Sequence, residues 1–185
     1  MPPLVFVDMF EVQFDSAAPL RSEYAPTALT NCRLVLNVAR LIGWPLGFAV
    51  DAQRLGRGPH SGATWINGFR PYRSDMVFET NGESCYSSME FAEAISSAGN
   101  CFLLAGFFNG RACLTTLVEA SAHGHHGGLI EDACYFSPLN GLDAPASRQA
   151  HIAVASCYAT TLTTTELLDI GNVPQSELEF TDDAK

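Results

Sequence analysis

Short apolar runs alternate along the chain with segments in which apolar residues recur every three or four positions. The runs are typical of strands buried on both faces of a sheet and lie at 4–7, 45–52, 75–80, 100–106 and 127–134. The helically spaced segments lie at 25–44, 87–99, 111–124 and 144–158. A sixth strand is expected at 158–164 and a short helix at 164–170, whereas residues 52–75 lack a clear period and predict a long loop.

This order of strands and helices predicts an α/β fold of three layers, αβα, with a mostly parallel six-stranded sheet and Rossmann-like crossovers. Residues 1–170 are expected to form one domain. Residues 171–185 are acidic and aperiodic, and they predict a mobile tail or an arm that packs on a partner subunit. Ligands of such folds bind at the carboxyl ends of the strands, so the residues that end each strand are the first candidates for a site.

Charge and composition narrow the classes of partner. The formal net charge of −10 and the dispersed cations argue against nucleic-acid binding, and no apolar run approaches the length of a membrane span. The six cysteines fall mostly in apolar segments and form no CxxC pair. Reduced thiols in a cytoplasmic protein are therefore expected rather than a disulfide framework.

Two residues at predicted strand ends combine into a chemical hypothesis. Asp8 closes the first strand, and Cys113 begins the helix after the fourth. In a parallel sheet both lie at one edge, where the carboxylate can take the thiol proton and the helix dipole favours the thiolate. The N–H groups of Ala112 and Cys113 are then candidates to bind an oxyanion. Taken singly, each has a plainer interpretation: Cys113 as core filler and Asp8 as a turn or cap residue.

Four segments, taken together, resemble the isochorismatase-like cysteine hydrolases. The segments are "LVFVDMFEVQF", "LLAGFFNGRACLTTLVEA", "GGLIEDAC" and "TLTTTELL", in that order along the chain. The resemblance covers most of residues 4–169. It implies the three-layer α/β fold, hydrolysis of a C–N or ester bond of a small molecule, and assembly as a homodimer or higher homo-oligomer.

The resemblance also assigns roles to residues. Asp8 matches the general base and Cys113 the nucleophile of the family. The family's catalytic lysine falls at Thr80, and the only lysine of the chain is its last residue. Arg111 or Arg73 is the candidate to replace the missing positive charge, because a buried thiolate without a cation is costly.

Aromatic and histidine residues complete the predicted site. Phe10, Phe14 and Tyr86 are candidates for an apolar pocket wall. His123, His125 and His126 are expected to form an exposed turn with glycine at the helix end rather than a metal site. Gln53 stands where metal-binding relatives have histidine, so neither a metal nor another cofactor is expected.

Two functions from different classes follow. The first is a cysteine hydrolase with Cys113 as nucleophile and Asp8 as base, atypical because it lacks the lysine. The second is a catalytically degenerate member of the family that binds a small molecule or a protein. A true isochorismatase fits less well, because that chemistry needs no thiol and relies on the lysine.

Overall fold

Six parallel strands form the centre of the protein. The computed structural model describes residues 1–10, 24–52, 64–106 and 110–171. The strands lie in the order β3-β2-β1-β4-β5-β6, and every neighbouring pair is parallel. Their bounds are β1 Leu4–Val7, β2 Leu46–Asp51, β3 Met76–Thr80, β4 Cys101–Gly106, β5 His126–Cys134 and β6 Thr160–Leu162. The predicted six-stranded α/β fold is confirmed.

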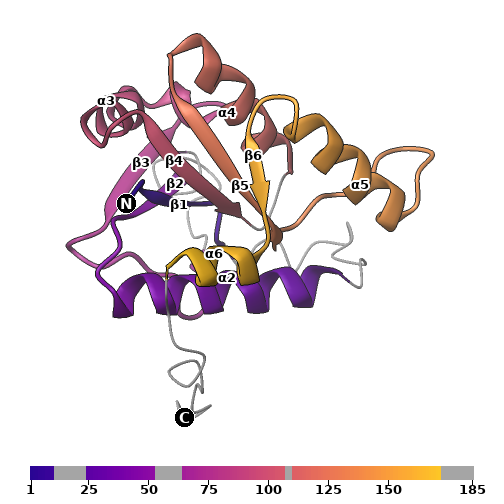
Figure 1. Ribbon diagram of the computed structural model, residues 1–185, viewed down its shortest axis with the longest axis horizontal. Coiled ribbons are helices and arrows are strands. Elements are labelled where there is room, and N and C mark those ends of the chain that lie inside the picture. Colours follow the sequence, from indigo (N-terminus) through magenta and orange to yellow (C-terminus); the bar gives the residue numbers. More distant parts are fainter. Residues whose placement is uncertain (11–23, 53–63, 107–109, 172–185) are drawn as a thin grey trace.

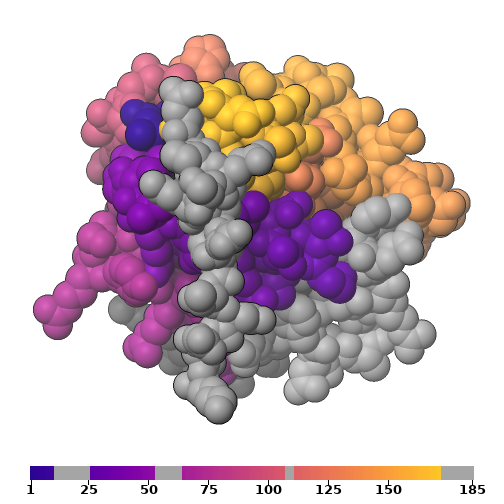
Figure 2. All heavy atoms as spheres, turned by 60° about the horizontal axis from the view of Figure 1, so that its bottom comes forward, coloured from indigo at the N-terminus to yellow at the C-terminus, as the bar shows by residue number. Residues whose placement is uncertain are grey.

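Helices cover both faces of this sheet (Figure 1). One face carries α2 (Tyr24–Leu41) and α6 (Thr164–Ile170), and the other carries α3 (Met89–Ser97), α4 (Gly110–Ala122) and α5 (Ala144–Ala155). A short 3-10 helix, η1 (Cys85–Ser87), links β3 to α3 and was not expected from the sequence. Figure 2 shows α2 and α6 next to each other on their side of the molecule.

Strand β1 illustrates how alternation distributes side chains between the two layers. Leu4 and Phe6 belong to the cluster under α2 and α6, whereas Val5 and Val7 belong to the cluster under α3, α4 and α5. All four side chains are buried, which explains why the sequence of this strand is a continuous apolar run. The alternation also predicts where the next residue, Asp8, would point if the strand continued.

The helix ends follow from their sequences. The carboxylate of Asp143 accepts a hydrogen bond from the N–H of Ala146 and caps α5. Thr163 and Glu166 form a capping box at α6, in which each side chain bonds the other's backbone. Among the described residues, none of the helices has both the length and the apolar character that crossing a membrane requires.

Candidate active site

Asp8 follows the last residue of β1 and leaves the extended course of the strand. Its φ of 55° lies in the left-handed region, which a residue with a side chain adopts only at a cost of about 1–3 kcal/mol. The N–H of Asp8 bonds the carbonyl of Ala49 at 3.0 Å, and its own carbonyl accepts from the N–H of Phe10 at 2.9 Å. Regular alternation from Val7 would send the Asp8 side chain toward α2. Its negative charge raises the pKa of Cys85 and of Cys113, two thiols of the opposite layer.

Cys113 lies in the first turn of α4 with 2% of its surface exposed. Four effects raise the pKa of its thiol well above the usual 9.0: a hydrogen bond with Cys134, burial, the charge effect of Cys134, and the negative charge of Asp8. The resting thiol therefore keeps its proton at neutral pH. Nucleophilic attack by this sulfur requires a base that removes the proton as the reaction proceeds.

Close packing of β1 against β4 brings the ends of these two strands together. A Cβ atom added to Gly106, the last residue of β4, would lie 2.9 Å from the carbonyl oxygen of Val7. Glycine is therefore required here, because that oxygen belongs to the backbone and cannot turn away. The contact holds the backbone just before Asp8 against the last residue of β4.

Cys134 is the residue that sequence reasoning missed. From Leu104 to Gly106, β4 advances two residues, while the paired part of β5 advances five, from Leu129 to Cys134. The three additional residues form a bulge, and the bulge brings Cys134 opposite Gly106. A cysteine at the end of a strand neighbouring β4 was the available signal, but the strand pattern does not reveal the bulge.

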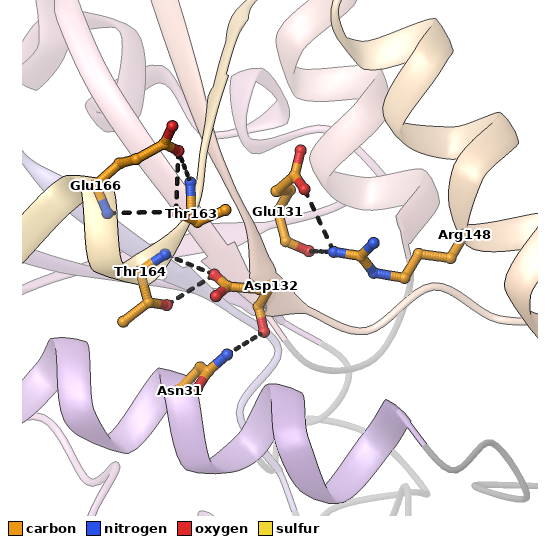
Figure 3. A network of polar contacts seen from close by, with 7 residues as sticks. All are labelled: Asn31, Glu131, Asp132, Arg148, Thr163, Thr164 and Glu166. Carbon is orange, nitrogen blue, oxygen red and sulfur yellow. Dashed lines mark hydrogen bonds and ion pairs between the residues drawn. The ribbon is translucent and has the colours of Figure 1, made fainter.

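A network of polar contacts holds the bulged segment in place (Figure 3). The Asp132 carboxylate accepts hydrogen bonds from the N–H and hydroxyl of Thr164, both at 2.7 Å, so it anchors α6. The Asp132 carbonyl accepts from the Asn31 amide of α2 at 2.9 Å. On the outer side, Arg148 binds the carboxylate of Glu131 at 3.5 Å and its carbonyl at 3.2 Å. The end of β5, and with it Cys134, is thereby tied to α2, α5 and α6.

Thr80 and Cys85 complete the described surroundings. Thr80 ends β3 and is 7% exposed. The N–H of Cys85 bonds the hydroxyl of Thr116, which donates to the carbonyl of Ala112, so η1 is fixed to the first turn of α4. Burial is the main cause that raises the pKa of Cys85 to about 12. Cys113 and Asp8 both act on this thiol by their charge and raise its pKa further.

The two arginines proposed as replacement charges lie elsewhere. The Arg111 guanidinium is 62% exposed and pairs with Glu83 at 3.1 Å on the surface. Arg73 is exposed and precedes β3, so it lies at the amino end of that strand, whereas Thr80 marks the carboxyl end. Neither is among the groups that shift the pKa of Cys113.

The predicted pocket wall is also rearranged. Phe10 is 1% exposed and packs its ring 4.4 Å from that of Trp65, so it belongs to the core under α2. Phe14 lies outside the described residues. Tyr86 points into the α3–α4 layer, where its ring stacks on His123 at 4.2 Å. It lines an open surface pocket of about 560 Å³ together with Ser84, Thr115, Glu119 and His123.

The expectation of three exposed histidines is wrong for His125. This residue is 6% exposed, and its two ring nitrogens bond the Tyr86 hydroxyl at 2.8 Å and the Ser96 hydroxyl at 3.0 Å. Burial, followed by the neighbouring His123, lowers its pKa. Gly124, at φ 69°, ends α4 as the sequence indicated. In the described part of the chain, no group of three or more histidine, cysteine or acidic side chains is arranged to hold a metal.

Known structures share this fold. An isochorismatase from Pseudomonas putida superposes with a TM-score of 0.76 at 21% identity, covering 89% of each chain. A putative hydrolase of the isochorismatase family from Chromobacterium violaceum gives 0.77 at 20% identity, over 93% of this chain and 94% of its own. A cysteine hydrolase from Pseudomonas syringae gives 0.74 at 15% identity, over 91% of each.

At identities of 15–21%, structural likeness shows only the fold, so the family is assigned from the sequence. No curated protein matched the sequence. The family description "Isochorismatase domain" matches residues 2–166, a span that begins before β1 and ends within α6. This protein is therefore a member of the isochorismatase family.

Proposed function

We propose that this protein is a cysteine hydrolase that cleaves a C–N bond, of amide or ureido type, or an ester bond of a small molecule. The observation that supports it best is that the negative charge of Asp8 acts on the buried Cys113 thiol. Asp8 follows β1 and Cys113 comes after β4, so both follow strand ends at the carboxyl edge of the sheet, where ligands of such folds bind. Likeness to the cysteine hydrolase from Pseudomonas syringae supports the same reaction class.

The reaction begins with proton transfer from Cys113 to Asp8. The sulfur attacks the carbonyl carbon as the proton leaves, so the thiolate does not accumulate on a thiol of raised pKa. Negative charge develops on the carbonyl oxygen, and the Ala112 and Cys113 N–H groups are proposed to bind it. Asp8 then returns the proton to the leaving amine or alcohol as the C–N or C–O bond breaks.

Water completes the cycle. Asp8, again a carboxylate, takes a proton from water, which attacks the thioester carbonyl formed with Cys113. The C–S bond breaks, the acid product leaves, and the sulfur recovers its proton. Catalysis therefore needs one group that both accepts and donates a proton, and Asp8 is the carboxylate among the described groups whose charge acts on this thiol.

A panel of activated esters, amides and ureido acids tests this proposal. Turnover is expected for at least one class, with a covalent adduct on Cys113 seen by mass spectrometry of the quenched reaction. Asp8→Asn is expected to lower kcat by about 10²–10⁴-fold, as removal of a general base does. Cys157→Ala, which changes an exposed cysteine, is the matched control and should leave turnover unchanged. Turnover that survives in Cys113→Ala would refute the proposal.

A second candidate is a family member that binds a small molecule or a protein without turnover. Two observations favour it: Thr80 stands where the resemblance places the catalytic lysine, and the Cys113 thiol holds its proton strongly. In this case no substrate of the panel is hydrolysed. Cys113→Ala and Asp8→Asn then leave the cellular role of the protein intact, which separates the two candidates. Assembly as a homodimer or higher homo-oligomer is proposed for either one and is measured by light scattering.

A further inference from the structure

Two cysteine side chains share a hydrogen bond at the candidate site. Cys113 of α4 and Cys134 at the end of β5 are 2% and 4% exposed, and both belong to the cluster under α3, α4 and α5. Both are free thiols in this structure. The hydrolytic reaction uses only the first of them, so the second sulfur has no role in the function proposed above.

The other two buried thiols near Cys113 are held by different partners. Cys32 donates its S–H to the carbonyl of Ala133 at 2.9 Å. Cys85 is hydrogen-bonded to Thr116 through its side chain, and its backbone N–H bonds the same hydroxyl at 2.9 Å. Cys134 is thus the described thiol whose interaction with Cys113 has the largest effect on the Cys113 pKa.

The arrangement around Cys134 keeps that sulfur in place. The bulge of β5 brings Cys134 opposite Gly106, and the neighbouring Tyr135 N–H bonds the Gly106 carbonyl at 3.0 Å. Asp132, two residues before Cys134, is anchored by Thr164. A thiol fixed next to a nucleophilic cysteine is the usual arrangement of a resolving cysteine, which captures a sulfenic acid before it oxidises further.

We propose that hydrogen peroxide converts Cys113 and Cys134 into a disulfide that reversibly switches off the site. The Cys113 sulfur attacks peroxide: an S–O bond forms, the O–O bond breaks, and one water leaves as the sulfur becomes a sulfenic acid. The Cys134 sulfur then attacks the Cys113 sulfur, so that an S–S bond forms and the S–O bond breaks. The departing hydroxide takes the Cys134 proton and leaves as a second water. Two thiols are oxidised together by two electrons, and one peroxide is reduced.

Asp8 has a part in the first step. Its carboxylate accepts the Cys113 proton as the sulfur attacks, as it does in hydrolysis. Since the Cys113 thiol is buried and holds its proton, oxidation is expected to be slow without this base. The inference goes beyond the proposed hydrolysis, because sulfur oxidation needs no substrate carbonyl.

Peptide mapping of the wild-type protein after graded peroxide treatment tests the inference without any substitution. After alkylation and non-reducing digestion, the expected product is a Cys113–Cys134 linked peptide pair that disappears on treatment with dithiothreitol. A disulfide from Cys113 to Cys85 or Cys32, or sulfinic acid at Cys113 with Cys134 still alkylated, would overturn the proposal. The measurement is independent of turnover, so it separates a failure of this inference from a failure of the hydrolase proposal.

Variants then assign the order of the steps. In Cys134→Ala, Cys113 is expected to pass to sulfinic acid that dithiothreitol does not reduce, so recovery of the free Cys113 thiol is lost. Asp8→Asn is expected to slow formation of the linked pair. Cys101→Ala changes a partly buried cysteine on β4 and is the control, in which the pair forms as in the wild type. Full recovery of the Cys113 thiol in Cys134→Ala would contradict a resolving role.

Discussion

Replacing Cys134 with alanine is expected to make Cys113 more reactive. The hydrogen bond with Cys134 is the largest cause that raises the pKa of the Cys113 thiol, and the charge effect of Cys134 acts in the same direction. Cys134→Ala removes both effects and leaves burial and Asp8 unchanged. The pKa of Cys113 should therefore fall.

The size of the effect follows from the strength of one hydrogen bond. An intramolecular hydrogen bond contributes about 0.5–1.5 kcal/mol. Losing the bond removes this stabilisation of the protonated thiol, so the pKa of Cys113 falls. Since the intrinsic nucleophilicity of a thiolate falls with its pKa, with a Brønsted slope of about 0.4–0.5, only about half of this gain reaches the rate. The net acceleration is about 1.5- to 4-fold.

Alkylation by iodoacetamide at fixed pH measures this acceleration. Cys113 is followed by quantitative peptide mapping, so that the other thiols do not obscure it. Cys157→Ala is treated in parallel and should show the wild-type rate, because this exposed residue is not among the groups that act on Cys113. A Cys113 rate in Cys134→Ala that is unchanged or lower, in a protein with wild-type thermal stability, would refute the role assigned to the hydrogen bond.

Three further substitutions test the architecture around the site. Gly106→Ala is expected to destabilise the protein by about 1–3 kcal/mol in urea unfolding, because the new methyl group meets the β1 backbone; Gly82→Ala, where a Cβ makes only ordinary contacts, should have a smaller effect. Asp132→Ala is expected to cost about 1.5–3 kcal/mol in the same assay, since Thr164 loses a charged acceptor; an unchanged midpoint would contradict this. Folding lowers the pKa of His125 from its ordinary value of 6.5, so the folded protein favours the neutral ring. The stability that this residue contributes is therefore present above pH 6.5 and is lost as the pH falls below that value. The urea midpoint of the wild type should thus drop between about pH 7.5 and about pH 5 more than that of His125→Asn; equal drops would show that the decrease has another origin.

The parallel sheet was predictable from the sequence, and the hypothesis that Asp8 acts on Cys113 uses the same reasoning. Apolar runs buried on both faces indicate parallel strands, and the residues that follow such strands all lie at one edge. Because β1 and β4 pair directly, the residue after β1 lies beside the end of β4. The backbone of Asp8, with its positive φ, was not foreseeable, because an aspartate after an apolar run gives no sign of it.

Other parts of the site depend on contacts that no local pattern records. Cys134 reaches Cys113 through a bulge, which has no periodic signature in the sequence. His125 is buried because Tyr86 and a serine of α3, from two separate segments, bond its ring. Arg111 stands two residues before the candidate nucleophile, yet its side chain extends to Glu83 at the surface. The position of Arg111 close to Cys113 in the sequence therefore does not show where its guanidinium lies.

Because β5 bulges, the pairing of Cys113 with Cys134 depends on the number of residues between Leu129 and Cys134, and not only on the presence of the two cysteines. One additional residue between Leu129 and Cys134 would bring Ala133 opposite Gly106, and one fewer would bring Tyr135 there. Relatives whose segment differs in length are therefore expected to keep the nucleophile and lose its sulfur neighbour, even where both cysteines remain in their sequences.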